Sequence, residues 1–128
     1  MDLKVPRVLD QSAFDGLCRK FVTNSDVSIS LPQCLSVSEI QELVLFLLGQ
    51  DSNDLRNLLL ADMVEDSAFP GNLLEEVFHK GDIGCRVAVS LRDDLSPQLE
   101  YLCSQSPEED VRSHYALRKA YRSNQKPK

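Results

Sequence analysis

Apolar residues recur along this chain in clusters spaced three or four positions apart, which is the period of a helix with one buried face. The clusters predict seven helices, which open near residues 12, 36, 52, 69, 82 or 84, 96 and 106. Two of them start at Ser-Pro pairs, Ser96-Pro97 and Ser106-Pro107, where the serine caps and the proline takes the first helical position. The pattern therefore predicts an all-α fold with short connections.

Other helix boundaries carry their own end signals. Ser36 and Glu39 have the spacing of a capping box, and Gly49 ends the helix that they open. Ser12 and Asp15 resemble a weaker box at the start of the first helix. We expect each of these helices to bury one apolar stripe.

Residues 24–35 depart from the helical period. Val27, Ile29 and Leu31 alternate with polar residues ahead of Pro32, which favours a short extended segment. Since no second strand is indicated elsewhere, we expect no sheet.

Two stretches of the chain, 69–94 and 95–118, superpose on each other. Arg86 and Leu91 of the first recur as Arg112 and Leu117 of the second, 26 positions later. A fainter third copy precedes them, with 43–48 in its first helix and Leu55-Arg56 opening its second. A two-helix unit cannot bury its apolar faces alone, so such units stack and share a core.

The repeat resembles HEAT-type and variant leucine-rich helical repeats, in which a second helix opens in Val-Arg followed by small apolar residues. Cys85–Val89 and Val111-Arg112 carry this resemblance, which covers about residues 69–120 and, more weakly, 36–66. It implies stacked antiparallel helix pairs in a short right-handed superhelix. It also implies that Arg86 and Arg112 are structural and pair with a loop acid such as Asp82 or Asp110.

The expected organisation is one helical-repeat domain, 1–122. Within it, 1–35 form an N-terminal cap with a capping helix, and 36–122 form two to three helix pairs. Residues 123–128 are expected to be a disordered basic tail. The longest apolar run, 43–48, is far shorter than the roughly 20 residues of a membrane span, and the N-terminus does not resemble a secretory signal. We therefore expect a cytoplasmic protein that does not enter membranes.

The net charge of −6 hides a gradient along the chain. Residues 1–38 are neutral, 39–110 hold sixteen acids against four bases, and 111–128 hold six bases and no acid. Such segregation steers a charged partner, although solvated helix faces and a frayed tail would also produce it. The acidic body argues against a protein that coats nucleic acid.

The sequence contains no recognisable catalytic or metal-binding constellation. The cysteines at 18, 34, 85 and 103 lack close pairs, so we interpret them mainly as small buried hydrophobes and expect no metal and no cofactor. His79 and His114 stand outside any metal-ligand spacing, and no nucleophile elbow, phosphate-binding loop or dinucleotide motif occurs. The sequence therefore gives no positive evidence that the protein is an enzyme.

These observations predict a small adaptor that uses an acidic helical-repeat surface to bind a basic protein. One alternative is an immunity protein that neutralises a basic bacterial toxin, and a second is a nucleic-acid-acting enzyme with HEAT-like repeats. The oligomeric state stays open. The candidate partner contacts are Arg92 and Arg118 at the exposed ends of the second helices, together with His114, Glu75, Glu76 and Glu100.

Overall fold

The computed structural model describes the backbone of residues 2–125 and the side chains of residues 2–121. Over that range the fold is mainly helical, with seven α-helices, one 3₁₀ turn and two short strands. In chain order the elements are β1 (Asp2–Lys4), α1 (Gln11–Thr23), β2 (Ser28–Ser30), α2 (Val37–Leu48), α3 (Asp54–Val64), η1 (Gly71–Leu73), α4 (Leu74–Lys80), α5 (Ile83–Ser90), α6 (Pro97–Ser104) and α7 (Glu109–Gln125).

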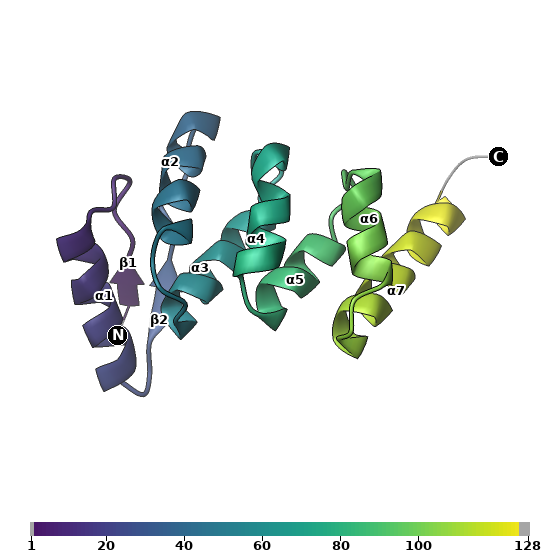
Figure 1. Ribbon diagram of the computed structural model, residues 1–128. Coiled ribbons are helices and arrows are strands. Elements are labelled where there is room, and N and C mark those ends of the chain that lie inside the picture. The colour runs from purple at the N-terminus through teal and green to yellow at the C-terminus, as the bar shows by residue number, and fades with distance from the viewer. Residues whose placement is uncertain (1, 126–128) are drawn as a thin grey trace.

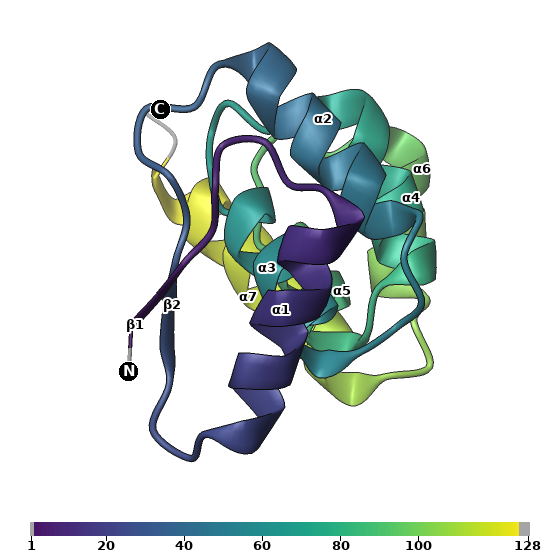
Figure 2. The ribbon, with the colours of Figure 1, turned by 90° about the vertical axis from the view of Figure 1, so that its left-hand side faces the viewer.

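The helices after β2 form two rows, which Figure 1 shows from the side. The first row contains α2, α4 and α6, and the second contains α3, α5 and α7. Each first-row helix packs against the second-row helix that follows it, and α5 packs against both α3 and α7. Figure 2 looks along the rows from the N-terminal end, where α1 and the strands lie.

One apolar core runs through both rows because each helix turns its buried stripe toward its neighbours. Leu59 and Leu60 of α3, Val77 of α4, Val89 of α5 and Val111 of α7 are completely buried. Each such side chain contributes roughly 1.5–3 kcal/mol by leaving water. The helical period read from the sequence therefore identifies the residues that hold the rows together.

The helix starts follow the expected caps in some places and shift by one residue or two in others. Ser36 and Glu39 form the expected capping box of α2. The prediction that Ser12 opens α1 is wrong, since the Asp10 carboxylate accepts the N–H of Ala13. Similarly, α3 is capped by Asn53. Asp, Asn and Ser cap about equally well, so local sequence does not decide between adjacent candidates.

The extended segment does form a sheet, contrary to expectation. β1 and β2 pair in parallel, with Leu3 opposite Ile29, and Leu3 and Val5 are buried. The N-terminal alternation of Leu3 and Val5 is only three residues long, which is too short to stand out in the sequence. Helix α1 connects the two strands, and this crossover supplies the partner that β2 needs (Figure 2).

The last helix is longer than expected. α7 continues to Gln125, so residues 123–125 are helical and are not part of a disordered tail. The rest of the predicted tail, 126–128, lies outside the described residues. Tyr121, near the end of this helix, is 55% exposed and does not join the core.

Three arginines occupy the same place, near the start of successive second-row helices. Arg56 donates to the carbonyl oxygen of Leu47 at 3.0 Å, at the end of α2. Arg86 donates to the carbonyl of Gly81 after α4, and Arg112 to that of Ser106 after α6. Each guanidinium thus donates to a carbonyl at the end of a first-row helix or just after it.

The acidic partner expected for these arginines differs from the one observed. Arg86 forms an ion pair with Glu108, whereas Asp82 caps α5 by accepting the N–H of Cys85. For Arg112 the described contact is a backbone carbonyl and not Asp110. The partner of Arg86 comes from the next helix pair, and sequence separation alone does not reveal it.

Candidate interaction surface

The exposed side of the second-row helices forms a surface that we call the second-row face. It consists of the outward stripes of α3, α5 and α7, whose residues recur at helical spacing. These residues are Asp54, Leu58 and Asp62 of α3 with its C-cap Glu65, Ile83 and Val87 of α5 with its C-cap Leu91, and His114, Leu117, Arg118 and Tyr121 of α7. The three helices lie side by side, so the stripes adjoin (Figure 1).

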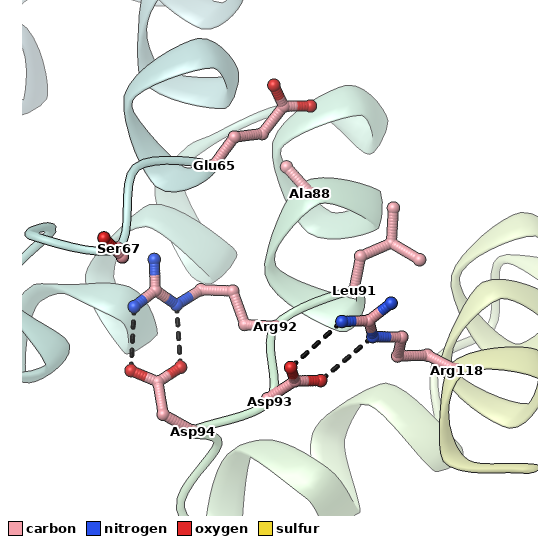
Figure 3. A pocket seen from close by; sticks show the side chains of 8 residues that line it. All are labelled: Glu65, Ser67, Ala88, Leu91, Arg92, Asp93, Asp94 and Arg118. Carbon is pink, nitrogen blue, oxygen red and sulfur yellow. Dashed lines mark hydrogen bonds and ion pairs between the residues drawn. The ribbon is translucent and has the colours of Figure 1, made fainter. Parts of the chain in front are cut away.

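A hollow of about 480 Å³ lies where the ends of α3 and α5 meet α7. Figure 3 shows it from close by. Its lining residues are Glu65, Ser67, Ala88, Leu91, Arg92, Asp93, Asp94 and Arg118. It is open to solvent and mainly polar at the rim, where two arginines each face an aspartate.

Arg92 is held inside the molecule. Its guanidinium makes two hydrogen bonds to Asp94, at 2.8 and 2.7 Å, and a third to the carbonyl oxygen of Val64. Only 10% of its side chain is exposed, and the hydrogen bonds from Arg92 lower the pKa of Asp94. The expectation that Arg92 lies at an exposed helix end is therefore wrong, and its role is to cap the end of α3.

Arg118 is more accessible and ties α7 to the loop after α5. It donates two hydrogen bonds of 2.9 Å to the carboxylate of Asp93 (Figure 3). The hydrogen bond to Asp93 raises the pKa of Arg118, and the guanidinium also lies over the ring of Tyr121. Arg118 thus stands on the second-row face with its charge matched by a neighbouring carboxylate.

A second hollow, of about 540 Å³, adjoins the first through the shared residues Leu91 and Arg118. It is lined by Leu91, His114, Leu117, Arg118, Ala120 and Tyr121. Leu117 is 69% exposed and Tyr121 is 55% exposed. None of the lining residues bears a carboxylate, so this end of the face is apolar with a cationic edge.

The opposite end of the face, on α3, is acidic. Asp62 and Glu65 are exposed, and neither forms an ion pair with any side chain that the structure describes. Partial burial raises the pKa of Asp62. Glu65 also lines the first hollow, whose two arginines are paired with Asp93 and Asp94.

The acidic candidates of the first row stand apart from this face. Glu75 and Glu76 lie on α4, at 3.7 Å from His79 and Lys80 respectively. Glu100 lies on α6 and accepts a hydrogen bond from the hydroxyl of Tyr115. The structure therefore brings His114 and Arg118 together on the second row, while the three glutamates belong to the first.

Neither histidine is arranged for a recognisable reaction. His79 is exposed beside Glu75 at the surface, and Nδ1 of His114 lies 2.6 Å from the backbone oxygen of Asp110, one turn earlier in α7. Among the described residues, no group of three or more His, Cys, Asp or Glu side chains is placed to hold a metal ion. Within the same range, no helix combines the length and apolar character that crossing a membrane requires.

The sequence pattern does not single out the apolar part of the face, since Leu91 and Leu117 stand out in it only as repeat positions. A signal for Leu117 exists, because it falls out of register with the buried Val111 and Tyr115 and so points to another side of α7.

Comparisons of the chain with protein-family models, with curated proteins and with solved structures found no match.

Proposed function

We propose that this protein is a non-catalytic protein-interaction module that binds a basic partner through the second-row face. The observation that carries the proposal is the continuity of two hollows across α3, α5 and α7, with Leu91, Leu117 and Tyr121 exposed along them. Exposed apolar residues gathered in one place, with polar residues around them, are typical of an interaction site.

The proposal includes a HEAT-like stack with a right-handed superhelical path. The recurrence of Arg56, Arg86 and Arg112 at the starts of α3, α5 and α7 supports it, because a repeated unit places the same side chain at the same joint. Stacks of this kind present extended surfaces and use them to hold protein segments. A cytoplasmic location is part of the same proposal.

The energetics favour a protein partner over a small molecule. Burial of Leu117 and Tyr121 together would contribute a few kcal/mol, at roughly 25 cal/mol per Å² of apolar surface. Both hollows are open and shallow, and they spread over three helices. A net charge of −12 in residues 39–110 would accelerate association with a basic protein.

Affinity capture from the source cells tests the proposal when it is combined with a matched pair of variants. Leu117→Ser removes an apolar contact of the second-row face, whereas Leu45→Ser makes the same change on the exposed side of α2 in the first row. We expect the unmodified chain and Leu45→Ser to retain one stoichiometric basic protein that Leu117→Ser loses. Equal recovery by all three proteins, or recovery of nucleic acid alone, would contradict the proposal. A captured nuclease toxin would narrow it to an immunity protein.

A further inference from the structure

The second-row face has two unlike ends. At the α3 end, Asp62 and Glu65 are exposed and form no ion pair among the described residues. At the α7 end, Leu117 and Tyr121 are exposed, and the charge of Arg118 is already matched by Asp93. The face therefore runs from an acidic edge to an apolar hollow.

Resting on the proposed function, we propose that the occupant of this face is a single amphipathic helix of the partner that is basic at one end and apolar at the other. Its apolar side chains pack on Leu91, Leu117 and Tyr121, and its Lys or Arg side chains reach Asp62 and Glu65. The helix lies across α3, α5 and α7 with its cationic end over α3.

The dimensions suit one short helix. Packed helices lie about 8–10 Å apart, so the face measures about 20 Å from α3 to α7. A helix rises 1.5 Å per residue, and about 13 residues span that distance. A segment of this length places cations and apolar anchors at opposite ends of the face.

Charge complementarity selects a basic occupant. A cation near Asp62 and Glu65 meets two carboxylates that form no ion pair among the described residues. An acidic segment would be repelled by these carboxylates at one end of the face. At the other end it would meet Arg118, whose charge is already paired with Asp93.

Synthetic peptides provide the probe. The basic probe is a helical peptide of about 13 residues with lysines in one half and an apolar leucine stripe in the other. A second peptide replaces every lysine by glutamate. Each carries a spin label at one end or the other and is titrated into the ¹⁵N-labelled full chain. We expect saturable binding of the basic probe, with a label at its lysine end broadening α3 amides and a label at its leucine end broadening α7 amides.

Matched variants separate local contacts from overall charge. Asp62→Lys with Glu65→Lys reverses the acidic edge, whereas Glu42→Lys with Asp51→Lys makes the same change in net charge at exposed positions elsewhere. We expect the first pair to weaken binding about tenfold or more and the second pair to change it by about twofold. Leu117→Ser should weaken binding, and Leu45→Ser should not. Circular dichroism of each variant confirms that the helices remain folded.

Equal affinity for the lysine and glutamate peptides would overturn the inference. So would equal effects of the two charge-reversal pairs, or broadening of α3 by the apolar end. If the peptides fail while capture of a cellular partner still depends on Leu117, the interaction function stands and the amphipathic basic helix is wrong. If Leu117→Ser also captures the cellular partner as well as the unmodified chain does, the proposed function is wrong too.

Discussion

Arg86 and Glu108 join two successive helix pairs. Nη2 of the guanidinium donates to Oε2 of the carboxylate at 2.8 Å, and Nε donates to Oε1. Arg86 lies in α5, and Glu108 immediately precedes α7, so the pair fixes the junction between the second and third helix pairs. The hydrogen bond from Arg86 lowers the pKa of Glu108.

We predict that Glu108→Gln lowers the free energy of unfolding by about 1 kcal/mol at pH 7, since the ion pair is partly solvated. The folded pKa of Glu108 is depressed, so its stabilisation is present above the unfolded value of about 4.3 and is lost as pH falls through the folded value. Urea denaturation at pH values from 7 to 3 measures the free energy of unfolding of both proteins. The difference between Glu108→Gln and wild type should shrink at low pH, and Glu109→Gln, at an exposed position, provides the control. A difference independent of pH would contradict the assignment.

The buried Arg56 should be among the most sensitive positions. Its side chain bonds to the carbonyl oxygens of Leu47 and Lys80, and the residue is only 3% exposed. We expect Arg56→Met to cost about 3 kcal/mol, because the carbonyls of Leu47 and Lys80 each lose a charged donor inside the protein. Chemical denaturation measures the loss. The exposed Arg19→Met serves as the control and should stay within about 0.5 kcal/mol of wild type.

Gly81 is required for the close approach of two helices. A methyl group on Gly81 would lie 2.4 Å from Cβ of Cys85 and 2.7 Å from the carbonyl oxygen of Val77. We predict that Gly81→Ala costs about 2–3 kcal/mol through overpacking, while Gly71→Ala is neutral, since nothing lies within 4 Å of its new methyl group. Thermal melts of both variants measure the difference. If Gly81→Ala and Gly71→Ala had equal melting temperatures, the junction between α4 and α5 would be able to accommodate the added methyl group, and the prediction would be wrong.

The four thiols should differ in reactivity. Cys34 is exposed, whereas Cys85 and Cys103 are buried, and burial raises the pKa of each buried thiol to about 11. We expect a brief iodoacetamide pulse at pH 8 to label Cys34 first and to spare Cys85 and Cys103, as measured by peptide mass spectrometry. Labelling of Cys103 as fast as Cys34 would contradict the packing of α6.

The same two thiols should influence stability at high pH. A raised folded pKa means that their contribution is fully present below the unfolded value and is lost as pH rises toward about 11. Denaturation series between pH 8 and pH 11, with Cys103→Ala for comparison, should show a shallower alkaline decline in the variant. An identical decline in both proteins would exclude a role for Cys103.

Local sequence was sufficient wherever a side chain acts on its own backbone. The capping box of Ser36 and Glu39 is one example, since its donors and acceptors lie within a single turn. The strand Asp2–Lys4 is a counter-example, because it exists only through pairing with a segment 26 positions away. The caps at Asp10 and Asn53 lie between these cases, because a second competent residue stands within two positions of each, Ser12 and Ser52 respectively.

The mainly helical fold, the order of its helices and most of its core can be read from the sequence, since helical periodicity and end signals are local. Which arginines are internal and which face outward depends instead on how the helices pack. Arg92 and Arg118 recur at equivalent places in the sequence, yet Arg92 reaches the end of α3 while Arg118 meets Asp93 on the second-row face. The gathering of Leu91, Leu117 and Tyr121 into one surface likewise depends on how α5 and α7 pack, because contacts between residues distant in sequence are set by packing and not by local pattern.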